Sequence, residues 1–432
     1  MRDELRAAFF PCRDRASVTR FRGRATARPA TRERGRFRLI PMPMHYQRSF
    51  FVLIGLLALA CIPGCRHEAS PTGIDLLPDS DLAGIEVYDS RGANSDARVS
   101  TFVLPSVGNT STFLPLGKTS DYTSRILLRW TGWPVDLASG GRIVSATVTL
   151  HASPFSFGQA SGQLSFNAHA VRKQWSMYTF TSDSLAALTT DPVPAGQYNG
   201  SIGDSIQFQL DSTLIRSWAN GESGGQVTGV WGLLLEPTGA TNTVYTFDAS
   251  ESSRKPATIR VVVARNGLSD TTLVPLQIED TFIASGPTPA VTELAVHGGL
   301  SWRGTVAFDL SAIPPGCIVN AATLRLTIDP SRTRKNIRGI DSVRVYELSD
   351  SATRSVGSEY TISIPDSGRR IIAKGLAMTR MVQRWVNHPE RNRGFVLVKV
   401  EEAGDLDLLA FYGPGAAAEL RPRLTVTFTR KP

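Results

Sequence analysis

Apolar and polar side chains alternate in short stretches throughout the second and third thirds of the chain. The clearest stretches are residues 146–150, 205–210, 323–328 and 424–428. Successive side chains of a strand point to opposite faces, so this period of two predicts strands with one buried face. Turn-forming clusters rich in Gly, Pro, Ser, Asn and Asp separate them, at 136–141, 220–225, 285–289 and 314–316. The pattern predicts an all-β protein built as a β-sandwich or jelly roll.

Two segments interrupt the alternation with apolar residues at helical spacing. They are residues 211–218 and 375–385, and each ends on a tryptophan, Trp218 or Trp385. Spacings of three and four residues place such side chains on one face of a helix. We therefore predict one short helix in each half of the body, with Trp218 and Trp385 as equivalent core residues.

The body of the chain also repeats itself. Seven landmarks recur in one order, at an offset that drifts from 180 to 166 residues. The matches are 101–103 with 281–283, 113–117 with 294–298, 125–130 with 303–308, 144–150 with 320–326, 214–220 with 381–387, 232–235 with 394–397, and 254–261 with 420–426. Such self-similarity predicts duplicated units. We expect a linker over 66–84, one jelly-roll domain over 85–265 and a second over 268–432.

The second copy carries a recognisable set of motifs. Phe308-Asp-Leu-Ser-Ala-Ile-Pro314 follows a strand with Arg303, and a closing Arg421-Pro-Arg-Leu-Thr-Val426 ends the copy. In this it resembles the DNRLRE-type domain, a jelly roll similar to carbohydrate-binding modules and common in secreted and surface proteins. The first copy departs from the pattern at residues 130–134, where Trp-Thr-Gly-Trp-Pro stands. The resemblance implies an extracellular jelly roll that in some members binds glycans.

A short apolar run that ends in cysteine lies ahead of the repeats. Residues 50–62 carry no charge and follow Arg48. The run is too short to cross a bilayer and suits the hydrophobic region of a secretory signal. Residues 44–65 resemble a bacterial lipoprotein signal, which implies cleavage before an acylated cysteine. Cys65 fits the lipobox slightly better than Cys61, but Pro63 is unusual there, so both stay open, as does a plain signal peptide with incidental cysteines.

This resemblance implies an exported protein anchored to a membrane by lipid. The residue after Cys65 is Arg66, whereas aspartate at that place retains such proteins at the inner membrane, so we expect the outer membrane or the cell surface. Residues 1–43 hold twelve arginines, no lysine and four acidic residues, and carry most of the net charge of +9. Such a basic leader is predicted to be disordered, and we expect translation to start at Met42 or Met44. The alternative is a real basic extension or presequence.

Because the basic excess belongs to the leader, the body gives no reason to expect a nucleic-acid partner. Its single cysteine, Cys317, cannot form an internal disulfide and is predicted to be a buried thiol. The histidines are isolated, and no metal-ligand spacing occurs. We expect no cofactor. The alternative is a structural Ca²⁺ near Glu401, Glu402, Asp405 and Asp407, but we favour the interpretation that these residues form a solvated loop. The sequence gives no indication of the oligomeric state.

Catalytic motifs are absent from the sequence. There is no nucleophile elbow, phosphate-binding loop or dinucleotide fingerprint, and no carboxylate pair is shared by the copies. We therefore expect a protein that is not an enzyme and binds or scaffolds at the cell envelope, with a polysaccharide as ligand. The alternatives are a structural or adhesive module that contacts protein and, less favoured, a polysaccharide-active enzyme of unrecognised type.

A sugar site needs flat aromatic faces beside polar groups. Trp302 follows Gly298 and Gly299 and precedes Arg303, which suits an acidic glycan. We predict that this turn lifts Trp302 away from the sheet, and that Trp302 with Arg303 binds ligand. The alternative is that Trp302 fills the core.

Overall fold

The computed structural model describes residues 84–430, with the exception of 92–96, 106–107, 109–110, 134–136, 138–140, 159–161, 223–230, 253, 266–267, 275–276, 336–340, 367–368 and 404–405. The predicted leader, the signal with Cys61 and Cys65, and the linker up to residue 83 lie outside this part of the chain. Among the described residues, no helix is both long and apolar enough to cross a membrane.

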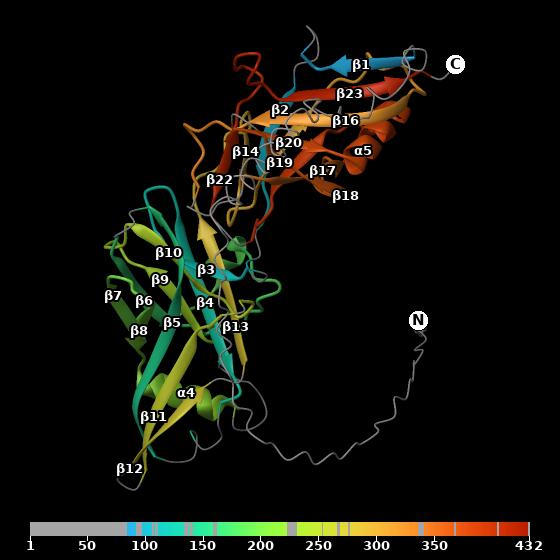
Figure 1. Ribbon diagram of the computed structural model, residues 1–432. Coiled ribbons are helices and arrows are strands. Elements are labelled where there is room, and N and C mark those ends of the chain that lie inside the picture. Colours follow the sequence, from blue (N-terminus) through green and yellow to red (C-terminus); the bar gives the residue numbers. More distant parts are fainter. Residues whose placement is uncertain are drawn as a thin grey trace, which may run out of the picture. The chain divides into compact units, whose positions relative to one another are not determined.

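The prediction of an all-β, sandwich-like protein is confirmed (Figure 1). The first sandwich contains β3 (Phe113–Lys118), β4 (Thr123–Thr131), β5 (Arg142–Gly158), β6 (Leu164–Ala170), β7 (Gly196–Gly200), β8 (Ser205–Gln209), β9 (Leu233–Pro237), β10 (Thr243–Asp248), β11 (Thr258–Arg265), β12 (Leu268–Val274) and β13 (Gln277–Ser285). Helix α4 (Ser212–Glu222) and the 3₁₀ helix η2 (Ser182–Ala187) belong to it.

The second sandwich takes strands from both ends of the described chain. They are β1 (Ile85–Asp89), β2 (Arg98–Val103), β14 (Leu294–His297), β15 (Trp302–Ala307), β16 (Ile318–Thr327), β17 (Val343–Asp350), β18 (Ser355–Ile362), β19 (Ile364–Asp366), β20 (Arg370–Lys374), β21 (Phe395–Lys399), β22 (Leu408–Phe411) and β23 (Arg423–Thr429). Helix α5 (Leu376–Asn387) and the 3₁₀ helix η3 (Pro389–Arg391) complete it.

The strands of the two sandwiches are arranged in the same order. In the first, β12-β11-β5 continues to β8, and β10-β3-β4-β9-β6-β7 carries β13 beside β4; β5 also pairs with β10. In the second, β1-β23-β16 continues to β20, and β22-β14-β15-β21-β17-β18 carries β2 beside β15. Helices α4 and α5 pack against the equivalent strands β5 and β16. The two halves of the body are therefore structural copies.

The pairing of the first strands does not follow the sequence repeat. Strands β1 and β2, which open the first repeat, pair with β23 and β15 of the second sandwich. Strands β12 and β13, which open the second repeat, pair with β11 and β4 of the first. In Figure 1 the blue β1 accordingly lies beside the red β23, and the yellow β13 beside the teal β4. The predicted ranges 85–265 and 268–432 mark the repeats, whereas the first sandwich runs from β3 to β13 and is inserted between β2 and β14.

Strand register also corrects one of the sequence matches. Arg125 lies opposite Ile283, and its counterpart Arg303 lies opposite Phe102. Phe102 is thus equivalent to Ile283, one residue away from the match with Phe282 that the sequence suggested. A shift of one residue exchanges the two faces of a strand, and Phe282 packs in the core whereas Ile283 belongs to a separate cluster on the outer face.

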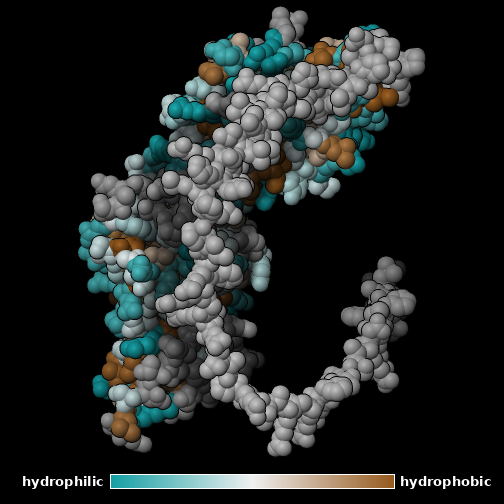
Figure 2. Space-filling view, viewed as in Figure 1, coloured by the Kyte–Doolittle hydropathy of each residue, from teal (hydrophilic) through white to brown (hydrophobic). Residues whose placement is uncertain are grey.

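Each core surrounds the tryptophan of its helix. Trp218 is buried, with its ring centroid 5.6 Å from that of Trp133. Trp385 is buried against Phe395 at 4.6 Å, and its indole N–H donates to Glu347 Oε1 over 2.7 Å. Cys317 is a buried free thiol. On the face of the molecule in Figure 2, hydrophobic residues occur in small groups among hydrophilic ones over the described surface.

Candidate functional site

Trp302 does not lie where the sequence analysis expected it. It is the first residue of β15, only 6% of its surface is exposed, and its ring centroid lies 5.2 Å from that of His297 on the paired strand. The turn at Gly298 and Gly299 therefore does not lift Trp302 away from the sheet. Side chains alternate along a strand, and Trp302 lies on the buried side of β15 with Gly304 and Val306, so it offers no flat face to a sugar.

Arg303, the next residue, points to the opposite side of the same sheet. Its guanidinium makes two hydrogen bonds to the Glu402 carboxylate, each 2.8 Å long. Burial disfavours the charged form, but the hydrogen bonds to Glu402 and the negative charge of that carboxylate together outweigh the effect of burial, so the pKa of Arg303 is raised. Of the predicted pair, the structure leaves only Arg303 on an outer surface, already held by a carboxylate.

The surface to which Arg303 belongs is the outer side of β2, β15, β21, β17 and β18, which we name the open face. Its base is a small apolar cluster of Phe102, Leu348, Val396 and Val398. Tyr346 packs against this cluster, and the Arg354 guanidinium lies 5.0 Å from the ring centroid of Phe102. The base is thus buried, and aromatic and basic side chains cover it.

An aromatic pair lies at the edge of the open face. Tyr360 on β18 stands directly opposite Tyr346 on β17, with ring centroids 5.1 Å apart and an angle of 37° between the planes. Tyr360 is 46% exposed and the adjacent Ile362 is 47% exposed. The Arg344 guanidinium lies 6.0 Å from the Tyr360 ring centroid. A flat aromatic surface and a cation therefore lie side by side.

The equivalent face of the first sandwich is covered. Leu127, Leu234 and Ile283 project from its outer side and are buried beneath Trp175 and Phe180. The covering side chains come from residues 171–195, the long connection between β6 and β7. In the second sandwich, the connection between β17 and β18 is only residues 351–354. Within the part of the chain that the structure describes, this difference in length accounts for most of the apolar layer that covers the first sandwich and that the second lacks.

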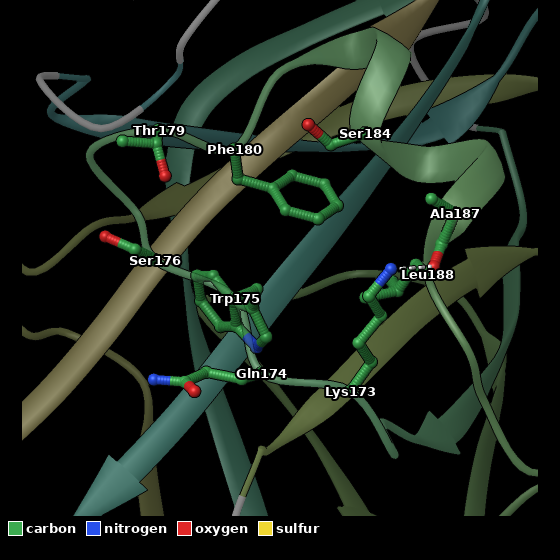
Figure 3. Close-up of a pocket in the computed structure, with 9 residues that line it drawn as sticks. All are labelled: Lys173, Gln174, Trp175, Ser176, Thr179, Phe180, Ser184, Ala187 and Leu188. Atoms are coloured by element: carbon green, nitrogen blue, oxygen red, sulfur yellow. Dashed lines mark hydrogen bonds between the residues drawn. The ribbon is translucent and has the colours of Figure 1, made fainter.

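The covering segment contains a cavity of its own, of about 260 Å³ (Figure 3). Its two aromatic rings, Trp175 and Phe180, are packed edge to face with centroids 6.1 Å apart. The Trp175 indole N–H donates to Trp231 O over 2.7 Å, and Lys173 Nζ donates to Ala187 O over 3.1 Å. These contacts use the aromatic faces and the cation internally, so the cavity offers no stacking platform.

Among the described residues, no group of three His, Cys, Asp or Glu side chains lies close enough together to hold a metal ion. Two acidic residues considered for calcium already have cationic partners. Glu402 binds Arg303, and the buried carboxylate of Asp407 lies 3.6 Å from Lys399 Nζ. Asp405 lies outside the described residues.

Comparison with known proteins adds no assignment, because no family model and no curated protein matches this chain. The function must therefore be argued from the geometry of the two sandwiches. That geometry singles out Arg344, Tyr346 and Tyr360, which the sequence analysis did not select.

Proposed function

We propose that this chain is an exported, lipid-anchored protein whose second sandwich binds a polysaccharide on the open face, without catalysing a reaction. One observation carries the proposal. Tyr360 is exposed and packs on the half-buried Tyr346 beside Arg344, on a face that the first sandwich covers with residues 171–195.

The chemistry of this surface suits a sugar chain. The C–H faces of pyranose rings pack on flat aromatic side chains, while neighbouring polar groups bind their hydroxyls. A guanidinium binds carboxylate or sulfate groups through charge-assisted hydrogen bonds. Arg344 therefore favours an acidic polysaccharide, and an open sheet face accommodates an extended chain better than a closed pocket does.

Anchoring is the second part of the proposal and rests on residues 44–65. Acylation of Cys65, or of Cys61, would hold the binding sandwich at the outer membrane or cell surface. Labelling with a palmitate analogue tests this: Cys65→Ser should abolish the label and release the protein from membranes. Loss of label only in Cys61→Ser would place the anchor at Cys61, and a labelled double variant would refute the anchor.

A second candidate function is adhesion to a protein. Strand β18 is an edge strand, and two of its exposed side chains, Tyr360 and Ile362, are followed by Ile364, which is 50% exposed. An exposed apolar edge is a template for pairing with a strand of another protein. This observation makes protein binding the alternative that the experiment must separate.

Binding to acidic and neutral polysaccharides, measured by glycan array and affinity electrophoresis, separates the two functions. Tyr360→Ala should weaken binding at least tenfold, since interface energy concentrates in a few aromatic residues. Tyr178→Ala is the matched control, because Tyr178 is 70% exposed but lies in the first sandwich. Equal loss in both variants, or no binding by the wild type, would favour the protein-binding function. Release of reducing sugar would contradict the non-catalytic assignment.

A further inference from the structure

A lysine and an aspartate are buried together in the second sandwich. Lys399 ends β21 and Asp407 directly precedes β22, and each residue is 0% exposed. Asp407 Oδ2 lies 3.6 Å from Lys399 Nζ. By comparison, the side chains of the Arg303–Glu402 pair keep 22% and 19% of their surface in water. Unlike a surface ion pair, Lys399 and Asp407 are therefore shielded from solvent.

The place of Lys399 in β21 explains the direction of its side chain. Phe395 and Leu397 belong to the core of the sandwich. Val396 and Val398 belong to the base of the open face. Side chains alternate along a strand, so Lys399 points to the core side, where a lysine is almost never fully buried without a partner.

The first sandwich has a proline at the equivalent position. Strands β9 and β21 both contain five residues, hold equivalent places in the strand order and follow a glycine with positive φ. The last residue of β9 is Pro237, whereas the last residue of β21 is Lys399. The shared fold therefore does not require a lysine here, and its burial in the second sandwich needs an explanation of its own.

A buried histidine lies beside the pair. His297 is 3% exposed, and the next residue, Gly298, donates its backbone N–H to the carbonyl oxygen of Asp407 over 3.0 Å. Burial and the neighbouring charge of Lys399 lower the pKa of His297 to about 4, so its ring is uncharged at neutral pH. A site that excludes water favours the neutral forms of an amine and a carboxyl group over the ions.

We propose that Lys399 and Asp407 are joined by an intramolecular amide bond between Nζ of the lysine and Cγ of the aspartate. The ammonium proton first passes to the carboxylate, which leaves a neutral amine and a carboxylic acid. The lone pair of Nζ then attacks Cγ. A proton passes from the nitrogen to the hydroxyl group of the intermediate, and the C–O bond breaks to release one molecule of water. The reaction needs no oxidant and no further reactant.

The fold supplies what this condensation requires. It holds the amine against the carboxyl group, which replaces a bimolecular encounter by an intramolecular one. It also excludes water, which would otherwise favour hydrolysis of the product. The bond closes residues 399–407 into a ring, and it does not depend on polysaccharide binding by the open face.

Peptide mapping of the whole chain by mass spectrometry tests the proposal. Trypsin should fail to cleave after Lys399 and should release residues 394–423 as one peptide, lighter than its sequence by one water. A protease specific for glutamate should cleave after Glu402, inside the ring, and leave the two arms joined. A peptide of unchanged mass that trypsin cleaves after Lys399 would overturn the proposal.

Two variants identify the bond. Lys399→Met removes the amine and should restore the full mass of the peptide, whereas water loss that persists in it would come from an aspartate backbone and would also overturn the proposal. Asp407→Asn should give the same joined peptide as the wild type, because its amide loses ammonia in place of water. If either variant does not fold, the wild-type map after cleavage at Glu402 still decides, since only a side-chain bond keeps the two arms together.

Discussion

The two sandwiches share a strand order and differ in what lies on one sheet. In the first, residues 171–195 bury Leu127, Leu234 and Ile283 beneath an added apolar layer. In the second, the equivalent face carries Tyr346, Tyr360 and Arg344 at the surface. A single connection between two strands accounts for the difference. The comparison teaches that two copies of one fold present different surfaces on the same sheet. Under the proposed function, the second sandwich binds ligand and the first serves as a scaffold.

We expect the largest effect when the chain is divided into fragments, because the two fragments should differ in whether they fold. A fragment of residues 104–290 keeps all strands of the first sandwich, so it should fold alone. Residues 268–432 lack β1 and β2, which pair with β23 and β15, and should show no cooperative unfolding transition. Urea denaturation followed by circular dichroism measures both. A stable fragment 268–432 would contradict the strand exchange.

Truncation of either helix tryptophan should destabilise only its own sandwich. Trp218→Ala and Trp385→Ala each remove a buried indole and leave a cavity, which costs about 3–5 kcal/mol. Trp385→Ala also deprives Glu347 of a hydrogen-bond donor. Calorimetry should show one transition lowered and the other unchanged. Variants that leave both transitions in place would refute the core assignment.

The stability of the first sandwich should depend on pH through the titration of Asp280. Burial raises the pKa of Asp280 from 3.8 to about 7, although Ser250 N donates to its carboxylate. The folded state therefore binds a proton more tightly than the unfolded state. The stabilisation that this bound proton gives the folded state is complete below pH 3.8 and is lost as the pH rises through 7.

Asp280→Asn removes this titration. Relative to wild type, the variant should gain stability between pH 4 and pH 8, by at most about 4 kcal/mol. Urea midpoints at pH 4.5 and pH 8 measure the change, and Asp248→Asn, which lies in the same sandwich, is a control for a general charge effect. A constant difference at the two pH values would show that Asp280 keeps its ordinary pKa.

The smallest expected effect comes from two substitutions whose costs in stability are compared, one on the covered face and one on the open face. Phe180→Ala in the covering segment should cost about 3 kcal/mol because its ring is buried. Tyr360→Ala should change stability by less than about 0.5 kcal/mol, since half of its surface is already in water. Urea midpoints compare the pair. A large cost for Tyr360→Ala would make that residue structural and remove it from the site.

Much of the fold followed from sequence. Alternation predicted the strands, and helical spacing placed Trp218 and Trp385 correctly in the cores. The exchange of β1 and β2 for β12 and β13 did not follow, because equivalent edge strands carry patterns that fit either copy. The one-residue error at Phe102 has a related origin, since only the paired strand fixes which face a residue takes.

The candidate site could be predicted from the sequence less well than the fold. Trp302 was expected on a turn because two glycines precede it, but it belongs to β15, whose alternation places its side chain on the buried side. A signal for the open face existed in the alternation of Arg344 with Tyr346 and of Tyr360 with Ile362. This signal identifies a face only together with the pairing of β17 with β18 and the cover that residues 171–195 give the other copy, and neither can be derived from the alternation.

Hydrogen exchange tests the central claim most directly, because it locates binding without a substitution. The whole chain is exchanged with and without the polysaccharide that it retains in affinity electrophoresis. Bound ligand should slow exchange in β17 and β18, residues 343–362, and leave residues 164–200 of the first sandwich unchanged. Protection confined to residues 164–200, or equal in the two sandwiches, would contradict the account.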